Sequence, residues 1–438
     1  MSSFLYKIKQ NLIASLFLKN TVILFSGTII ASVLNYLFNL IIGRVLTVDE
    51  YGQLVSLESI FLIVTMIGGA IILAGTRKVA EYKANKNFAK LAQFKSYFEK
   101  KFLYFGIIVF IILTAFSDLI AQYLKIQKAP IIIMASCLIL AYVGSFYISI
   151  LQGLQRFKAL SIVNVIGTIL KIILGVGLVL LGFSVSGAVV GYVFPSVICA
   201  VIIYLLLRDI KLNKADFINL QSIKISTKQI QSISYFFITS LCLTLLYNID
   251  LILVKHYFSN NDAGLYSSLA MLARIIFFGT GIIASVLLPM ATEKFERQEK
   301  HQHLFIYALL LVTVLGILLN ILYFIFPEQI IKMLFGAKYL QSSNLLGIMS
   351  VVMTAYSILN LIITYLISIK KFIFLPILAA GSILQIIFII IFHASLFQVI
   401  MICLIINSLI SLISFMFVYF PKEKNKNYAE HLNSSAGL

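Results

Sequence analysis

Two basic residues, Lys171 and Arg274, interrupt the long apolar stretches 161–181 and 265–288. Each lies about ten positions from one end of its stretch, or ~14 Å at ~1.5 Å per helical residue. A cation at that depth in a bilayer costs roughly 2.5 to 3.5 kcal/mol, so it usually faces a wet cavity or a polar partner. Two cations at one depth, one from each half of the chain and with no acid at that depth, would attract a diphosphate group. Bonding to backbone carbonyls, or snorkelling, is the alternative.

Other polar residues accompany these cations. Asn164, Thr168 and Lys171 are spaced i, i+4, i+7, so they share one helical face. Asp250 lies near the end of another apolar stretch, where a carboxylate could take up a proton or Na⁺ and bias a conformational change. A structural cap, or a contact with Lys255, is the alternative role for Asp250.

The cysteines and histidines of the sequence are not spaced as catalytic or metal-binding residues are. The four cysteines are widely separated within apolar stretches, and the five histidines form no metal pattern. We therefore predict a protein without catalytic residues, metal or cofactor. Several polar residues of the later stretches are expected to form ordinary interhelical hydrogen bonds, namely Asn360, Thr364, Gln385, Asn407 and Ser411.

The composition places these residues in a membrane. With 61% hydrophobic and 11% charged residues among 438, the chain is too apolar for soluble domains. Its apolar stretches are close to the ~20 residues that span a bilayer, and they are continuous, which favours helices over a β-barrel. The predicted fold is an all-α polytopic membrane protein of about twelve transmembrane helices. These are 21–43, 54–75, 102–123, 130–151, 161–181, 185–207, 235–254, 265–288, 304–326, 343–369, 372–392 and 396–420.

The charge distribution predicts the orientation of these helices. A net charge of +18 could suggest nucleic acid, but 26 of the 34 Lys and Arg residues lie in the termini and alternate connections, against 6 in the other connections. The positive-inside rule therefore places both termini in the cytoplasm. Lys19 argues against a cleaved signal peptide. Residues 1–20 are instead predicted to form an interfacial helix with one apolar face, made of Phe4, Leu5, Ile8, Leu12 and Leu16.

The connection from Arg77 to Lys101 carries eight cationic residues. Its apolar residues recur at spacings of three and four, which predicts an amphipathic helix resting on anionic lipid headgroups. A solvated loop is the alternative. The apolar residues concerned are Phe88, Leu91, Phe94 and Phe98.

The chain contains a corner motif twice. Thr47 is followed by an acid three positions later and by Gly52 two further on, and Ser259 is followed by an acid and by Gly264 at the same spacing. We expect each glycine to permit a sharp reversal of the chain.

A second motif that occurs twice supports an internal repeat. Arg156-Phe157 returns as Lys371-Phe372 at an offset of 215, and Gly167 returns as Gly381 at 214. The repeat predicts two parallel six-helix lobes around a central cavity, an arrangement typical of transporters. The predicted parts are an interfacial helix at 1–20, lobes at 21–207 and 234–420, a cytoplasmic connector at 208–233, and a cytoplasmic tail at 421–438.

Three phrases of the sequence resemble the polysaccharide flippase family, within the multidrug/oligosaccharidyl-lipid/polysaccharide exporter superfamily. They are Gly43-Arg44-Val45-Leu46 through Glu50-Tyr51-Gly52, Leu151-Gln152-Gly153-Leu154-Gln155-Arg156-Phe157, and Asp250 through Ala263-Gly264-Leu265-Tyr266-Ser267. The resemblance runs from about 20 to 420. It implies a transporter that moves a polyprenyl-diphosphate-linked oligosaccharide from the cytoplasmic to the outer leaflet of a bacterial cytoplasmic membrane, without making or breaking a bond.

The resemblance also implies roles for particular residues. Relatives have cationic residues facing the cavity, and several have a carboxylate on the seventh helix that couples transport to an H⁺ or Na⁺ gradient; Arg274 and Asp250 match these positions. The predicted substrate-binding residues are Arg274, Lys171, Asn164, Thr168 and Arg44. Membrane lipids are the other expected partner, and a glycan polymerase is a further candidate. Fourteen-helix relatives have a further helix pair, and a groove formed by it is not expected in a twelve-helix protein.

Two other functions remain open. A cation-coupled multidrug antiporter of the same superfamily would be expected to hold more acidic than basic charge inside its spans. A membrane polysaccharide polymerase or ligase would need a sizeable outer loop or a cluster of catalytic residues. The longest predicted outer connection, between Phe326 and Ser343, contains no histidine.

Overall fold

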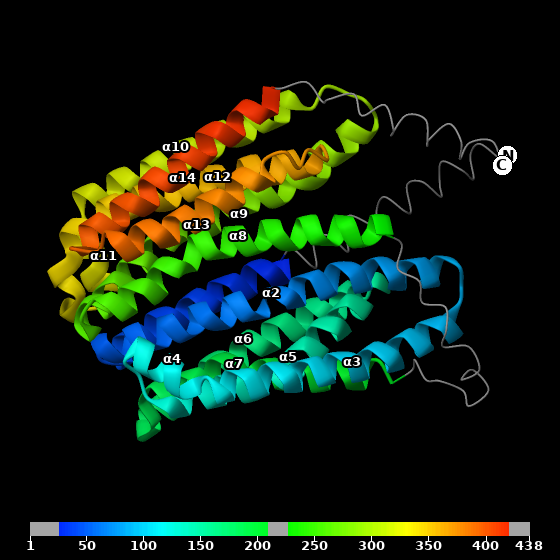
Figure 1. Ribbon diagram of the computed structural model, residues 1–438, viewed down its shortest axis with the longest axis horizontal. Helices are drawn as coiled ribbons and strands as arrows, with labels where there is room; N and C mark the ends of the chain where they lie inside the picture. The colour runs from blue at the N-terminus through cyan, green and yellow to red at the C-terminus, as the bar shows by residue number, and fades with distance from the viewer. Residues whose placement is uncertain (1–25, 209–226, 420–438) are drawn as a thin grey trace.

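The computed structural model describes residues 26–208 and 227–419, and every regular element in those two ranges is helical (Figure 1). The predicted all-α fold is confirmed. The first lobe contains a helix at Ser26–Val45, α2 (Val48–Ala84), α3 (Phe88–Ala115), α4 (Ser117–Leu124), α5 (Lys128–Gly153), α6 (Phe157–Leu178), the π-helical turn η1 (Val179–Phe183) and α7 (Ser184–Leu206). The second lobe contains α8 (Thr227–Tyr257), α9 (Asn260–Glu296), α10 (Gln302–Ile325), α11 (Pro327–Leu334), the 3₁₀ turn η4 (Ala337–Leu345), α12 (Leu346–Ser368), α13 (Leu375–Ile391) and α14 (Leu396–Tyr419). The predicted interfacial helix, most of the connector and the tail lie outside the described residues.

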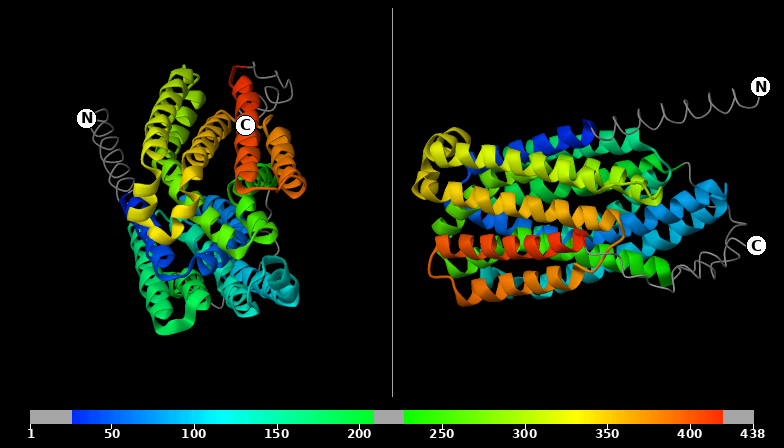
Figure 2. Two further views of the ribbon diagram at one scale, coloured as in Figure 1. Left: turned by 90° about the vertical axis from the view of Figure 1, so that its left-hand side faces the viewer. Right: turned by 90° about the horizontal axis from the view of Figure 1, so that it is seen from above.

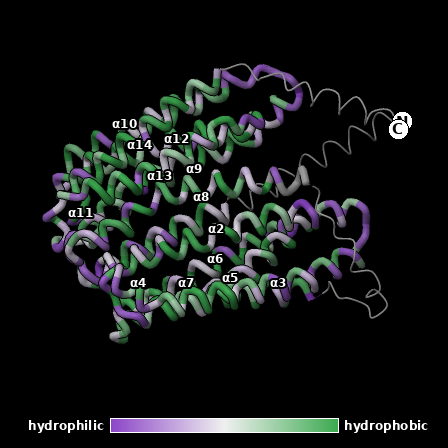
Figure 3. Tube along the Cα trace, viewed as in Figure 1, coloured by the Kyte–Doolittle hydropathy of each residue, from purple (hydrophilic) through white to green (hydrophobic). Residues whose placement is uncertain are grey.

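As far as it lies in the described ranges, each of the twelve predicted spans falls on a helix or a bent helix pair. In the described ranges, nine segments are long and apolar enough to cross a membrane, or ten if α3 and α4, bent by 56°, count as one span. One of the nine, Phe157–Leu206, contains both α6 and α7, because the chain turns at Gly182 with a φ of +92° that glycine readily adopts. The remaining predicted span is α13, an apolar helix of 17 residues. Hydrophilic residues gather at both ends of the bundle (Figure 3).

The corner motif is a pair of equivalent helix N-caps. The Thr47 hydroxyl accepts a hydrogen bond from the Glu50 backbone N–H, and the Glu50 carboxylate accepts one from the Thr47 backbone N–H at 2.9 Å, which makes a capping box at the start of α2. The Ser259 hydroxyl caps α9 in the same way, accepting from the Asp262 backbone N–H at 3.1 Å. These side chains satisfy amide groups that a helix start leaves unpaired.

The two corner glycines lie inside the helices that the caps begin, so the expected sharp reversal at these positions was wrong. They serve close packing instead. A Cβ at Gly52 would lie 2.7 Å from the backbone nitrogen of Gly264, and a Cβ at Gly264 would lie 1.9 Å from the Val48 carbonyl oxygen. Equivalent positions of the two repeats therefore meet backbone to backbone.

The two copies of the second repeated motif also lie at equivalent positions in the two lobes. Arg156, between α5 and α6, donates to the carbonyl of Leu206 at the end of α7 (3.0 Å). Lys371, between α12 and α13, donates to the carbonyl of Phe417 near the end of α14 (3.3 Å). In each lobe a cation thus binds carbonyl groups at the C-terminal end of the last helix, where the helix dipole favours positive charge.

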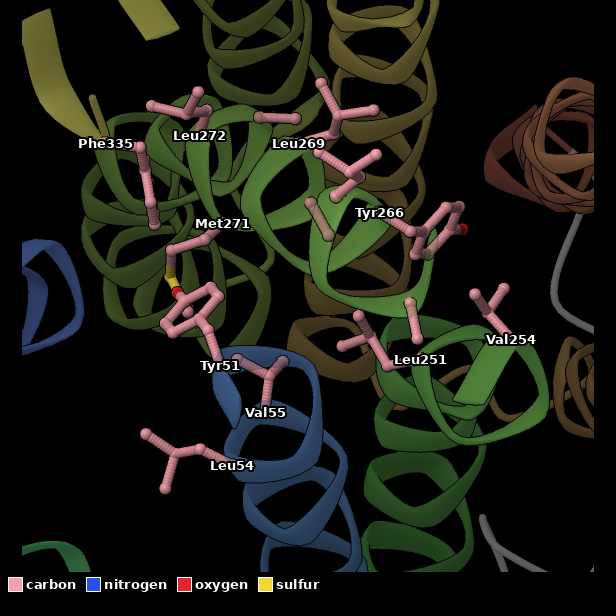
Figure 4. Close-up of a cluster of buried hydrophobic side chains, with 14 of the residues drawn as sticks. Tyr51, Leu54, Val55, Leu251, Val254, Tyr266, Leu269, Met271, Leu272 and Phe335 are labelled. Carbon is pink, nitrogen blue, oxygen red and sulfur yellow. The ribbon is translucent and has the colours of Figure 1, made fainter. Parts of the chain in front are cut away.

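The two lobes lie one above the other in Figure 1 and form two separate groups of helices in the end view of Figure 2. Contacts between them gather at the end that carries Thr47 and Ser259, the predicted outer end. There the Tyr339 hydroxyl donates to the carbonyl of Gly43 (2.8 Å), and the His256 ring stacks on Tyr123 (3.7 Å between centroids). Figure 4 shows the adjoining buried cluster, in which Tyr51 and Val55 of α2 lie beside Leu251 of α8 and Met271 of α9.

The basic segment Arg77–Lys101 is the helical hairpin formed by the end of α2 and the start of α3. The prediction that its apolar face rests on lipid headgroups was wrong for two of the four residues. Leu91 and Phe94 are buried, and Phe94 packs on Tyr82 of α2 and Phe146 of α5 (centroids 5.8 and 5.6 Å apart). Apolar burial within the lobe replaces the expected membrane contact, whereas Phe88 remains exposed.

Labelling of single cysteines tests the predicted orientation. Lys128 begins α5 and Lys86 lies in the turn between α2 and α3, and both side chains are exposed. The start of α5 and the turn between α2 and α3 lie at opposite ends of the bundle (Figure 1). In a cysteine-free background, we expect an impermeant thiol reagent to label Lys128→Cys in intact cells and to label Lys86→Cys only after lysis. Labelling of Lys86→Cys in intact cells would reverse the orientation.

Candidate functional site

Lys171 is buried in a polar and aromatic pocket of the first lobe. Its ammonium donates to the side-chain oxygen of Asn35 (3.1 Å), and it lies over the rings of Phe38 and Tyr192, at 4.3 and 4.0 Å from their centroids. These contacts bring together the first helix, α6 and α7. Cation–π contacts and one hydrogen bond stabilise the ammonium without a direct ion pair.

Arg274 has a matching environment in the second lobe. Its guanidinium lies 3.9 Å from the ring centroid of Tyr247 and donates to the Tyr247 carbonyl (2.8 Å) and to the side-chain oxygen of Asn248 (3.1 Å). The Nε of Arg274 is buried and has no partner in the structure. The side chain is only 5% exposed, close to the 7% of Lys171. Both cations are therefore held by neutral groups of their own lobe and keep unused capacity for an anion.

Glu58 of α2 changes the expected charge balance. The prediction placed no acid at the depth of the two cations, and this was wrong, because Glu58 is buried and interacts electrostatically with both Lys171 and Arg274. None of the ion pairs within 4.0 Å among the described residues involves these three side chains. Glu58 Oε1 is buried without a hydrogen-bond partner. One carboxylate thus interacts electrostatically with cations from different lobes without being bonded to either.

Asp250 forms a second acidic position, in the second lobe. The Tyr266 hydroxyl donates to Asp250 Oδ2 (2.7 Å), and Oδ1 is buried without a partner. Arg274 interacts electrostatically with Asp250. The alternative contact with Lys255 is absent, since that ammonium donates to Asn260.

The other predicted site residues are distributed differently. Thr168 is buried on α6 and donates to the carbonyls of Asn164 (3.2 Å) and Val165 (2.9 Å) of its own helix. Arg44 lies apart from this group, at the predicted outer end, and its guanidinium donates to the carbonyls of Met333 and Leu334 in α11. The structure therefore groups Lys171 with Arg274 and places Arg44 in a contact between the lobes.

Sequence reasoning missed two kinds of residue. Glu58 could have been predicted from the sequence. It is the one acid inside the predicted span 54–75, and burying its charge in a membrane costs as much as burying Lys171 or Arg274. Phe38 and Tyr192 carried no such signal, since a tyrosine or phenylalanine in an apolar stretch is indistinguishable from ordinary packing. Among the described residues, no group of three or more His, Cys, Asp or Glu could hold a metal ion, and the four cysteines are free thiols.

The chain resembles known transporters over most of its length. It matches a multidrug resistance MATE family transporter of the MOP superfamily in an inward-facing conformation, with a TM-score of 0.73, 13% identity, and coverage of 91% of this chain and 97% of that one. A transporter of the same family in an outward-facing conformation gives a TM-score of 0.63 at 15% identity (91% and 94% covered). The lipid II flippase MurJ, in an inward closed conformation, gives 0.67 at 17% identity (91% and 88% covered). No curated protein sequence matches the chain.

These similarities show the fold class: a bundle of helices in two lobes, arranged as in the structures of MOP superfamily transporters. A family model described as polysaccharide biosynthesis protein matches residues 17–295. The chain belongs to this polysaccharide biosynthesis protein family.

Proposed function

We propose that the protein is a flippase that moves a polyprenyl-diphosphate-linked oligosaccharide from the cytoplasmic to the outer leaflet by alternating access of its lobes. The observation that carries this proposal is the pair of buried cations, Lys171 and Arg274, which come from different lobes and both interact electrostatically with Glu58. A diphosphate bound between them would draw the lobes together through charge-assisted hydrogen bonds. The lobe contacts at the predicted outer end support a resting state closed on that side, to which substrate comes from the cytoplasm.

Glu58 would allow the site to exchange a proton when it binds or releases the substrate. Without substrate, its carboxylate partly offsets the two cations, and with a diphosphate bound, a second anion beside it would be repelled. Uptake of a proton by Glu58 would relieve this repulsion, so substrate binding and proton binding are linked. Asp250 is the second candidate for this role, because it interacts with Arg274 and has an unpaired oxygen.

Conservative amide variants should show which of the two carboxylates, Glu58 or Asp250, couples transport to an ion gradient. We expect Glu58→Gln to reduce transport about tenfold or more and to abolish its response to a pH gradient, because an amide retains the shape but binds no proton. Asp250→Asn should have the same effect if the coupling site is at Asp250, and a small effect if its hydrogen bond to Tyr266 is structural. The measurement is transport by purified protein in vesicles with and without imposed H⁺ and Na⁺ gradients. A full gradient response in both variants would contradict carboxylate coupling.

A cation-coupled antiporter is the second candidate, because Glu58 and Asp250 equal Lys171 and Arg274 in number, and the predicted excess of basic charge in the site does not hold. One reconstitution distinguishes the candidates. Proteoliposomes would contain a fluorescent prenyl-diphosphate-linked glycan, and an impermeant reagent would report its arrival in the opposite leaflet. We expect protein-dependent movement of this lipid and none with protein-free vesicles. Gradient-driven export of a lipophilic cation, without movement of the glycan lipid, would overturn the proposal.

A further inference from the structure

An aromatic pocket lies in the first lobe, away from the three charges of the central site. The space within it, counted together with its open mouth, is about 530 Å³. Four phenylalanine rings form much of its wall, together with Ile71, Ala74 and Gly75 of α2. These rings are Phe94, Phe98 and Phe102 of α3 and Phe146 of α5.

The aromatic wall is pre-formed. Phe94 and Phe98 lie 4.7 Å apart between centroids, Phe98 and Phe102 lie 5.8 Å apart, and Phe146 contacts Phe102 at 5.3 Å. Phe94 and Phe146 are buried in the core of the lobe, whereas Phe98 and Phe102 are partly exposed. A ligand can thus cover the exposed rings without disturbing the buried ones.

Two cations, Arg77 and Lys78, line the same pocket. Lys78 is already engaged, since its ammonium lies 2.9 Å from Glu81. Arg77 is exposed and has no hydrogen-bond or ion-pair partner among the described residues. Arg77 lies two positions beyond the end of the predicted span 54–75, at the level expected for lipid headgroups. The pocket therefore combines an apolar wall within the membrane with a free guanidinium at its surface, which is complementary to a lipid with a phosphate head.

We propose that this pocket is an entry site for the substrate lipid, holding the first isoprene units of the prenyl chain against the phenylalanine rings with the diphosphate on Arg77. This inference rests on the proposed flippase function and adds a second substrate site to it. Ile233 of α8, the first helix of the second lobe, also lines the pocket. A lipid bound there contacts both lobes at the predicted cytoplasmic end, where its glycan can enter between them and reach Lys171 and Arg274.

Photolabelling of the full-length protein tests the site. The probe is a short prenyl diphosphate carrying a diazirine on its second isoprene unit, added to protein in phosphatidylcholine nanodiscs. We expect peptides with Phe98 and Phe102 to be labelled, and an unlabelled prenyl diphosphate to compete where the same concentration of phosphatidylglycerol does not. Arg77→Gln should lower labelling about tenfold, and Ala74→Phe should abolish it by filling the pocket.

Lys100→Gln is the matched control, because Lys100 is an exposed cation of α3 that does not line the pocket. It should leave labelling unchanged, and thermal unfolding should confirm that all three variants fold. Equal competition by phosphatidylglycerol, or undiminished labelling of Arg77→Gln, would overturn the entry site. Labelling near Lys171 and Arg274 alone would also overturn it while leaving the flippase proposal intact. Pocket labelling in a protein that does not move the glycan lipid would uphold the site and refute the flippase function.

Discussion

Arg274→Ala is expected to lower the rate of glycan-lipid movement in proteoliposomes about a hundredfold or more. In the proposed complex, Arg274 and the diphosphate form a buried, hydrogen-bonded charge pair. Truncating one partner of such a pair costs about 2–5 kcal/mol, and about 1.4 kcal/mol corresponds to tenfold. Arg274→Lys should retain partial activity, because lysine keeps the charge but lacks the planar pair of donors that a phosphate can accept together. The measurement is the initial rate at a substrate concentration below saturation, compared with the amount of inserted protein.

Arg297→Ala provides the control for Arg274. Arg297 follows the same helix and forms an exposed ion pair with Glu293 (2.7 Å), so its loss should leave transport unchanged. Both variants should unfold within a few degrees of the unmodified protein, since the hydrogen-bond partners of Arg274 are neutral groups and no carboxylate is bonded to it. Loss of folded Arg274→Ala would indicate a structural role, and full transport by the double variant with Lys171→Ala would refute the proposed substrate site.

Gly264→Ala is expected to weaken the closure of the lobes at the predicted outer end and to impair transport strongly. The added Cβ would lie 1.9 Å from the carbonyl oxygen of Val48, and because that atom belongs to the backbone, α2 itself must move. Overpacking of this kind costs about 1–3 kcal/mol. A reporter for the opening is Ser56→Cys in a cysteine-free background, since Ser56 is fully buried and donates to the carbonyls of Gly52 (2.8 Å) and Leu251 (3.4 Å). Its labelling from outside should rise about tenfold.

Gly279→Ala is the matched control on the same helix. A Cβ at Gly279 would meet no atom within 4 Å, so this variant should neither expose Ser56→Cys nor change transport. If both glycine variants expose the reporter equally, the effect comes from helix propensity and not from the contact between the lobes. If neither does, the backbone contact at Gly264 does not hold the lobes closed.

The helical architecture could be predicted because its causes are local. Twelve continuous apolar stretches each have the length that a bilayer requires, and backbone groups in a membrane must be bonded within the segment. The repeat was also readable, because the caps at Thr47 and Ser259 and the cations Arg156 and Lys371 occupy equivalent helix ends. The same patterns did not reveal that Gly52 meets Gly264, since a glycine placed for close packing looks like a glycine placed for a turn.

Part of the candidate site could likewise be predicted from the sequence, and part depends on the tertiary structure. The sequence by itself determined that Lys171 and Arg274 are buried cations, because charge inside an apolar helix must be accommodated wherever that helix lies. Only the tertiary structure decided what accommodates them: Phe38 and Tyr192 around one, Tyr247 and Asn248 around the other, and Glu58 near both. These partners come from helices far apart in the chain, and hydrophobic burial sets no preference for which apolar face meets which. The pairing of faces, and with it the balance of charge between the lobes, follows from how the two repeats pack.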